Sequence, residues 1–289
     1  MKVLLATDGS EHANAAVEFL ARLPHAHPLE LTILAVAPAM TYHGSLEVTE
    51  WMEKHAQAEQ RRFSQICARA AQVFEGADAT VQTMVVQGHP AEEIVKRSEE
   101  LRSDLIVVGA LGGSAVTRLI LGSVSDFVAS HAKCSVMVVR PSVSGEVVHS
   151  TPRLCIADGE SPPAQFAMQQ LCEFAWGKTV PVDLVHVIVP VPVVAELPFP
   201  IDTESWRTEM HDMLERRAER LKKLSSNVEA HVVEASHVGE GLVQFATQRH
   251  SDLVVVGSTG RGLLASFLMG SVSRYVLRHA PCSVWIARP

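Results

Sequence analysis

The sequence predicts an α/β protein with two tandem doubly wound domains, each built on a five-stranded parallel sheet with helices on both faces. Three observations support this fold class. Short apolar runs alternate with longer helical patterns, which is typical of parallel strands buried on both faces. The whole series occurs twice within 289 residues. In each copy, a stretch with the same glycine and serine spacing follows the fourth apolar run.

The first half contains the five predicted strands in order. Apolar runs of strand length lie at 2–7, 29–37, 80–86, 104–109 and 134–140, and helical patterns lie between them at 12–22, 49–74, 90–101 and 123–131. The long 49–74 stretch is amphipathic, as expected of a helix that covers one face of a sheet. These elements predict a first domain at residues 1–141.

Residues 142–152 are predicted to form a linker, because prolines flank a segment of Ser and Gly with little periodicity. The order of elements then restarts in a second domain at 153–289. RLCIAD matches KVLLATD, so that Asp158 corresponds to Asp8. The runs VDLVHVIV, VEAHVVEA, DLVVVG and CSVWIAR, with helical patterns at 203–225 and 239–249, complete the copy. The proline-rich stretch 190–200 is interpreted as a stiff surface connection, with a lid or a partner surface as alternatives.

Two glycine-bearing stretches carry the functional signal: VVGALGGSAVTRLILGSVS at 107–125 and VVGSTGRGLLASFLMGSVS at 255–273. A strand that runs into such a loop and then into a helix presents unpaired amides and the positive end of the helix dipole, which is an anion site. Glycines that only make turns and serines that only cap helices are the alternative, and the duplication argues against it. Neither the Walker A pattern nor the dinucleotide fingerprint is present.

The aspartate after the first strand, the GxxG loop and the Gly-Ser-Val-Ser helix entrance, each present twice, resemble the universal stress protein family in its tandem form. The glycine motif resembles that of the family's ATP-binding branch, and the resemblance covers nearly the whole chain apart from the linker. It implies a strand order of 3-2-1-4-5, with nucleotide over the carboxyl ends of strands 1 and 4. It also implies ATP, or AMP or ADP, as the ligand, with any Mg²⁺ brought by the phosphates.

The resemblance assigns site residues as well. Asp8 and Asp158 are expected to meet the nucleoside, and the backbone at Val36 and Val187 is expected to read the adenine edge. The remaining positions are expected to hold ribose and phosphates: Gly109, Gly112, Gly122, Ser123, Val124 and Ser125 in the first domain, and Gly257, Gly260, Gly270, Ser271, Val272 and Ser273 in the second.

The two predicted sites differ in charge. Ser123 is predicted to cap its helix, with Asp126 three residues on as in a capping box. The second domain has Arg274 at the place of Asp126. Because like charge weakens anion binding and opposite charge strengthens it, we expect the second site to be the tighter one, unless both charges are fully solvated.

The loops favour binding over catalysis. Neither 110–125 nor 258–273 contains Asp or Glu, so they supply no carboxylate for Mg²⁺ and no base for a hydrolytic water. We therefore expect no catalytic residue and predict a nucleotide-dependent sensor or regulator in a stress response. The alternatives are a slow ATPase or autophosphorylating protein, and a structural pseudo-dimer with vestigial sites. The 14 histidines show no metal-ligand spacing, so no metal site is expected.

Composition limits the remaining classes of partner and location. A net charge of −7 and a pI near 6.0 argue against nucleic acid and anionic membranes as partners. Without a signal peptide pattern or a long apolar run, the protein is expected to be cytoplasmic. The apolar last strands of the two domains need cover. The resemblance suggests that they pair as an intramolecular pseudo-dimer, which a homodimer and an unknown protein partner would extend.

Overall fold

The computed structural model describes residues 1–23, 28–39, 46–111, 121–141, 151–159, 161–174, 176, 178–190, 203–258 and 269–289. Its chain forms two compact units, Met1–Pro141 and Ser142–Pro289. Gly112, Gly260 and most of the predicted linker lie outside the described residues.

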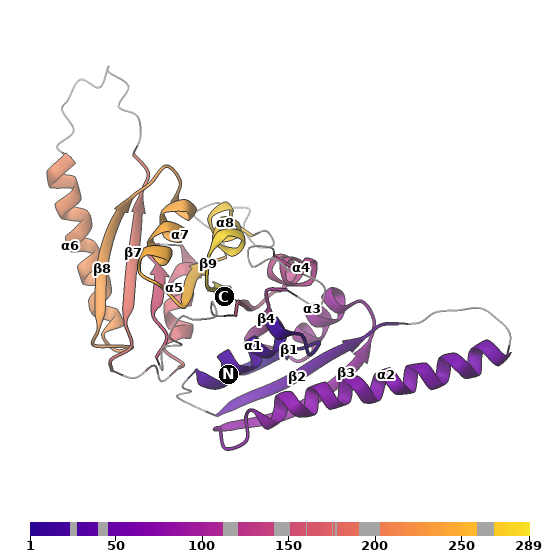
Figure 1. Cartoon of the computed structure of the whole chain (residues 1–289). Helices are drawn as coiled ribbons and strands as arrows, with labels where there is room; N and C mark the ends of the chain where they lie inside the picture. The colour runs from indigo at the N-terminus through magenta and orange to yellow at the C-terminus, as the bar shows by residue number, and fades with distance from the viewer. Residues whose placement is uncertain are drawn as a thin grey trace. The chain divides into compact units, whose positions relative to one another are not determined.

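The first unit is built on a parallel sheet (Figure 1). Its strands are β1 (Lys2–Ala6), β2 (Leu29–Ala37), β3 (Ala79–Gln87), β4 (Leu105–Gly109) and β5 (Ser135–Val139). They lie in the order β3-β2-β1-β4-β5, and every neighbouring pair is parallel. The predicted order 3-2-1-4-5 is confirmed.

Helices connect these strands: α1 (Glu11–Arg22), α2 (Leu46–Gln72), α3 (Pro90–Glu100) and α4 (Ser123–His131). The connections through α1 and α2 run outward from β1 to β3, whereas those through α3 and α4 run the other way, from β3 to β5. Right-handed crossovers then place the two pairs on opposite faces of the sheet. In agreement, α2 contacts β2 and β3, and α3 contacts α4.

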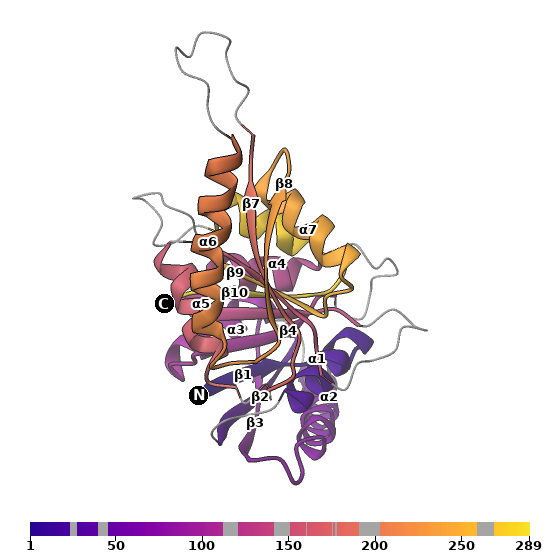
Figure 2. The same cartoon turned by 90° about the vertical axis from the view of Figure 1, so that its left-hand side faces the viewer.

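The second unit repeats the plan. Its strands are β6 (Leu154–Ala157), β7 (Val182–Ile188), β8 (Val228–Glu234), β9 (Leu253–Gly257) and β10 (Ser283–Ala287), parallel and in the order β8-β7-β6-β9-β10. Its helices are α5 (Pro162–Leu171), α6 (Thr203–Leu221), α7 (Val238–Gln248) and α8 (Ser271–His279). Figure 2 shows the long α6 beside β7 and β8, which it contacts.

The core of each unit lies on both faces of its central strands. Leu4 and Leu5 are neighbours in β1 and point to opposite faces, yet both are 0% exposed. Val254 and Val255 of β9 are equally buried. Both sheets are therefore covered on two sides, as the continuous apolar runs predict.

The pairing register corrects one predicted correspondence between the units. Leu4 of β1 pairs with Ile106 of β4, and Cys155 of β6 pairs with Val254 of β9. Ile106 and Val254 are the third residues of the repeated runs DLIVVG and DLVVVG. Cys155 of the second unit therefore corresponds to Leu4 of the first.

Counting three residues on from this pair, Asp158 stands at the place of Thr7, and Gly159 stands at the place of Asp8. The predicted match of Asp158 with Asp8 is therefore one residue off. The repeated Asp-Gly letters at 8–9 and 158–159 align in the sequence but not in the sheet. Hydrogen bonds between strands, rather than the loop residues that follow them, determine which positions are equivalent.

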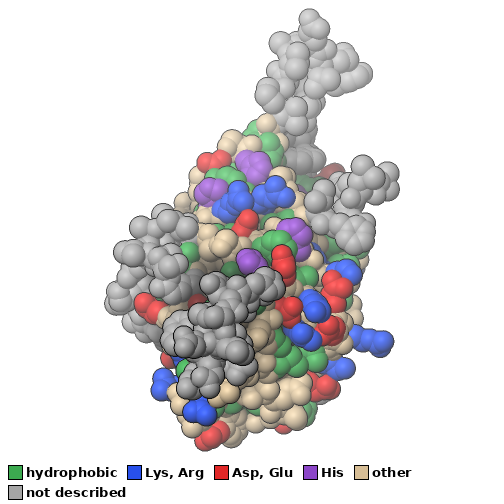
Figure 3. All heavy atoms as spheres, turned by 90° about the vertical axis from the view of Figure 1, so that its right-hand side faces the viewer, with side chains coloured by type: hydrophobic (Ala, Val, Ile, Leu, Met, Phe, Trp, Pro, Cys, Tyr) green, Lys and Arg blue, Asp and Glu red, His purple; other side chains and the backbone are tan. Residues whose placement is uncertain are grey.

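The surface and the thiols are unremarkable for a protein of this composition. The five cysteines are free thiols. On the face drawn in Figure 3, Lys and Arg side chains lie among Asp and Glu side chains. None of the helices that the structure describes combines the length and apolar character needed to cross a membrane.

Candidate functional site

A cavity of about 320 Å³ lies at the carboxyl ends of β1 and β4 in the first unit. Seven of the eight predicted residues of this domain line it: Asp8, Val36, Gly109, Gly122, Ser123, Val124 and Ser125. The eighth, Gly112, lies outside the described residues. Residues that the sequence reasoning did not single out complete the lining: Ala6, Thr7, Ala13, Leu34, Pro90, Ile94, Val108 and Leu111. Most of these are apolar, and only their position at strand and helix ends could have indicated them.

The helix that opens onto this cavity, α4, begins without a side-chain cap. Its N-cap is Gly122, and Ser123 is the first helical residue, so the predicted capping box of Ser123 with Asp126 is wrong. Glycine has no side chain to accept hydrogen bonds from the first-turn amides. These amides, together with the positive end of the helix dipole, are available to an anion in the cavity.

The hydroxyl of Ser125 holds the loop rather than facing a ligand. Ser125 is 1% exposed, and its Oγ lies 2.8 Å from the carbonyl oxygen of Ala110 and 3.0 Å from that of Gly122. Both partners are acceptors, so the single hydroxyl proton is directed at the backbone. This serine positions the helix entrance, and its backbone amide remains the group that an anion would contact.

Gly109 has a structural role in addition to the predicted one. A Cβ at Gly109 would lie 2.6 Å from the carbonyl carbon and oxygen of His12 in α1. A Cβ at Gly257 in the second unit would lie 2.8 Å from the amide nitrogen of Ala164 in α5. The glycine at the end of the fourth strand is thus required because a helix backbone packs directly against it.

The carboxylate of Asp8 stands at the other side of the cavity. The amide of Ser10 donates a hydrogen bond of 2.9 Å to Asp8 Oδ1, and the amide of Gly9 donates to Thr7 Oγ1 at 3.2 Å. Gly9 adopts a φ of 76°, the left-handed region that favours glycine. Asp8 itself is exposed, and it is the single carboxylate among the cavity-lining residues that the structure describes.

These features give the cavity three chemically distinct parts. The α4 amides form an electropositive end, and Asp8 forms an acceptor for donors such as hydroxyl groups. Val36 and Ile94 contribute an apolar surface. Such a site suits a ligand that carries an anion, hydrogen-bond donors and a flat apolar group.

Asp158 is part of a closed ion-pair cluster in the second unit. Its side chain is 0% exposed, Arg217 Nη1 lies 2.7 Å from Asp158 Oδ2, and His186 Nδ1 lies 2.9 Å from the same oxygen. Burial by itself raises the pKa of Asp158, but the hydrogen bonds from His186 and Arg217 and the charge of Arg217 together hold that pKa below its ordinary value. The carboxylate is therefore ionised and already bound within the protein.

Other predicted residues of the second unit keep the local geometry of the first. Gly270 is the N-cap of α8 and offers no side-chain cap, and Ser273 Oγ lies 2.9 Å from the carbonyl oxygen of Ser258. Ser271 and Val272 follow Gly270 in the first turn of α8. Near Val187 the packing is tight: a Cβ at Gly241 of α7 would lie 2.7 Å from Val187 Cγ1.

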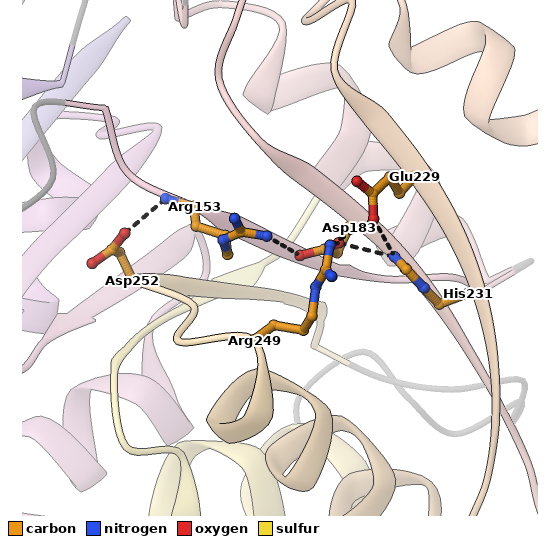
Figure 4. Close-up of polar contacts among 6 residues, drawn as sticks. All are labelled: Arg153, Asp183, Glu229, His231, Arg249 and Asp252. Atoms are coloured by element: carbon orange, nitrogen blue, oxygen red, sulfur yellow. Dashed lines mark hydrogen bonds and ion pairs between the residues drawn. The ribbon is translucent and has the colours of Figure 1, made fainter.

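A second charged cluster surrounds Asp183, near the start of β7 (Figure 4). Arg249 Nη2 lies 2.9 Å from Asp183 Oδ1 and 2.6 Å from Glu229 Oε2, and His231 Nε2 lies 2.9 Å from Asp183 Oδ1. Arg153 Nη1 approaches Asp183 Oδ2 at 3.5 Å. Sequence reasoning missed this cluster because its members are brought together from β7, β8, the end of α7 and the segment before β6.

The Asp183 cluster contains three groups that can bind metals, and an arginine stands among them. One ligand atom each of Asp183, Glu229 and His231 lies within 4.8 Å of the others. Arg249 already bridges the two carboxylates with a positive charge. A metal ion would have to displace this guanidinium, so the arrangement fits a structural ion-pair network better than a metal site.

Comparisons with known proteins agree with this architecture. Residues 1–140 and 151–288 each match the model of the universal stress protein family. A universal stress protein of Mycolicibacterium smegmatis is 29% identical over 299 residues, covering 99% of this chain and 97% of that protein. A universal stress protein of Mycobacterium tuberculosis is 31% identical over 298 residues, covering 99% and 96%. The crystal structure of a universal stress protein from Archaeoglobus fulgidus matches the fold with a TM-score of 0.67 at 20% identity, covering 99% of this chain and 98% of that chain.

Proposed function

Because this chain belongs to the universal stress protein family, and because its first unit has a cavity with an uncapped helix start opposite a carboxylate, we propose that it binds an adenine nucleotide there. The protein would act as a nucleotide-dependent sensor or regulator in a stress response. The ligand is ATP, or AMP or ADP, and ATP would bring Mg²⁺ through its own phosphates. The single observation that carries the proposal is the set of α4 amides left without a side-chain cap at the cavity wall.

Each part of the nucleotide has a counterpart in the cavity. The amides of Ser123, Val124 and Ser125 would bind phosphate oxygens, since a helix N-terminus is a ready anion site. The carboxylate of Asp8 would accept hydrogen bonds from the nucleoside, and adenine would lie against Val36. The volume of about 320 Å³ falls at the lower end of the range of about 300 to 1,000 Å³ for small-molecule sites.

Binding is favoured over catalysis by the chemistry of the lining. Phosphoryl transfer needs groups that hold the metal and orient the nucleophile. Asp8 is the single carboxylate among the described lining residues, and the proposal assigns it to the nucleoside. A slow ATPase or autophosphorylating protein is the second candidate. Labelled ATP separates the two, because a sensor retains it unhydrolysed through a single-turnover assay, whereas an ATPase releases phosphate.

The substitution Ser123→Asp tests the proposal at the helix start. An added carboxylate in the first turn favours the helix through its dipole, so the fold should hold or gain stability. The same charge repels phosphate, and we expect the Kd for ATP to rise at least about tenfold, equivalent to about 1.4 kcal/mol. Ser123→Asn, which adds a similar volume without charge, is the matched control and should bind ATP within about twofold of the wild type.

Isothermal titration calorimetry with ATP and with adenosine gives the readout, and thermal unfolding reports the fold. Adenosine lacks phosphate, so its affinity should not change in Ser123→Asp. An ATP affinity that stays at the wild-type value in a folded Ser123→Asp variant would contradict the proposed phosphate site. The proposal also places the protein in the cytoplasm, where ATP is abundant, with occupancy read by a protein partner.

A further inference from the structure

The two units differ at three facing positions beside the carboxyl ends of β1 and β6. The first pair is Thr7 and Asp158, by the register of the sheets. The second pair is Ala35 and His186. Leu4 pairs with Thr32 in β2, and its equivalent Cys155 pairs with Asp183 in β7. Ala35 and His186 each lie three residues after that partner.

The third pair is Ile66 of α2 and Arg217 of α6. The two helices bury the same pattern of positions, at Phe63, Cys67 and Ala70 in α2 and at Leu214, Ala218 and Leu221 in α6. Ile66 and Arg217 each stand directly before the middle one of these buried residues. Ile66 lies against Gly9, with its Cδ1 3.1 Å from the place of a Cβ there, whereas Arg217 bonds to Asp158.

At these three positions, the first unit therefore has neutral side chains, whereas the second unit has a charged cluster whose members bond to one another. Both partners of Asp158 bind the same oxygen, Oδ2. Its Oδ1 is buried and has no hydrogen-bond partner among the described residues. The position that holds the exposed carboxylate of Asp8 in the first unit is occupied by Gly159, which has no side chain.

We propose that each chain binds one nucleotide, in its first unit. In the second unit, the cluster of Asp158, Arg217 and His186 takes the place of the nucleoside contact and ties α6 to the end of β6. This cluster is called the lock. This inference rests on the proposed function. It reverses the expectation, based on the charges of Asp126 and Arg274, that the second site binds nucleotide more tightly. A favourable charge near the phosphates does not compensate for a missing nucleoside contact.

In the second unit, α7 packs closely at the position predicted to meet adenine. The α7 backbone at Gly241 packs onto the side chain of Val187, the residue predicted to read adenine. In the first unit, the equivalent Val36 lines the cavity together with Pro90 and Ile94.

Counting bound nucleotide tests the inference. Native mass spectrometry of the full chain with excess ATP should show one nucleotide per chain. The matched variants Ser123→Asp and Ser271→Asp introduce the same negative charge at the first residues of α4 and α8, respectively. We expect the bound nucleotide to be lost in the first and kept in the second. Two nucleotides per chain, or loss in Ser271→Asp, would overturn the inference, whereas no nucleotide in the wild type would instead refute the proposed function.

The lock itself is tested without nucleotide, by a double-mutant cycle on thermal unfolding. Arg217→Ile leaves the buried carboxylate without its cation and should lower Tm by more than about 5 °C. Asp158→Thr combined with Arg217→Ile copies two of the three first-unit residues, Thr7 and Ile66, and should lose less than Arg217→Ile alone. Losses that simply add would show that the two side chains are not coupled, and the lock would be refuted.

Discussion

At the scale of single residues, the second unit keeps its buried carboxylates ionised by surrounding them with cations. Asp183 is 1% exposed, and burial by itself raises its pKa, but hydrogen bonds from His231 and Arg249 and the charge of Arg249 hold that pKa below its ordinary value. A buried charge is costly unless it is paired and hydrogen-bonded. The contribution of such a cluster to stability therefore becomes visible when one partner is removed, and it is not the sum of the individual contacts.

Asp183→Asn should consequently destabilise the second unit far more than a change at the exposed end of the same network. Removing the central charge leaves Arg249 and Arg153 facing a neutral amide, and we expect a loss of about 2 to 4 kcal/mol in the free energy of unfolding. Glu229→Gln is the matched control. The Glu229 side chain is 54% exposed, so its loss should cost at most about 1 kcal/mol. Urea unfolding measures both, and equal losses would show that Asp183 is not the centre of the network.

At the scale of elements, the glycine at the end of β4 allows the neighbouring helix α1 to pack closely. The resemblance assigned Gly109 to the ribose and phosphates, and the structure shows that this glycine also leaves room for the backbone of α1 at His12. The N-cap of this helix is Ser10, whose Oγ accepts a hydrogen bond from the Ala13 amide. The packing of α1 on β4 helps to keep Asp8, which follows β1, and Gly109 in the lining of the same cavity. Gly109 thus shapes the cavity through the fold.

Gly109→Ala should therefore lower stability more than Gly122→Ala does. The added methyl at Gly109 meets backbone atoms at 2.6 Å, which can yield only if α1 shifts. Overpacking of this kind costs about 1 to 3 kcal/mol. At Gly122 the nearest atom is the carbonyl oxygen of Ala110 at 3.2 Å, so a smaller shift suffices. Chemical denaturation of both variants gives the comparison, and a larger loss for Gly122→Ala would contradict this account of the packing.

At the scale of the whole molecule, the repeated order of apolar runs predicted most of the fold. It predicted ten strands in two parallel-sheet domains, whereas the strand order 3-2-1-4-5 was implied by the resemblance to the universal stress protein family. The positions that it missed depend on contacts between distant segments. Asp158 was misplaced by one residue because the Asp-Gly letters match while the sheet register does not. Its partner Arg217 lies in the charge-rich run 215–223, a pattern typical of a solvated helix face, and nothing local indicates that α6 brings this side chain to Asp158. Pairing of the last strands across the domains stays a prediction.

Acid should weaken the second unit before the first. Among the carboxylates that the structure describes, Asp158 and Asp183 are the two whose pKa values are lowered by their partners, and both belong to the second unit. A carboxyl group with a folded-state pKa below its unfolded value of about 3.9 contributes stability that is complete above that value. The contribution is lost as the pH falls through the folded-state pKa, because the unfolded chain then binds more protons.

Hydrogen exchange at pH 7 and at about pH 3.5 follows this loss element by element, since the pH window begins near the unfolded carboxyl pKa of about 3.9. Amides of β6, β7 and α6 should lose protection at the lower pH while those of β1, β2 and α1 keep theirs. In Asp183→Asn one of the two titrating groups is gone, so the difference in stability between the two pH values should shrink for the second unit. Simultaneous loss in both units, or an unchanged pH difference in that variant, would show that acid acts through charge repulsion over the whole surface rather than through these two clusters.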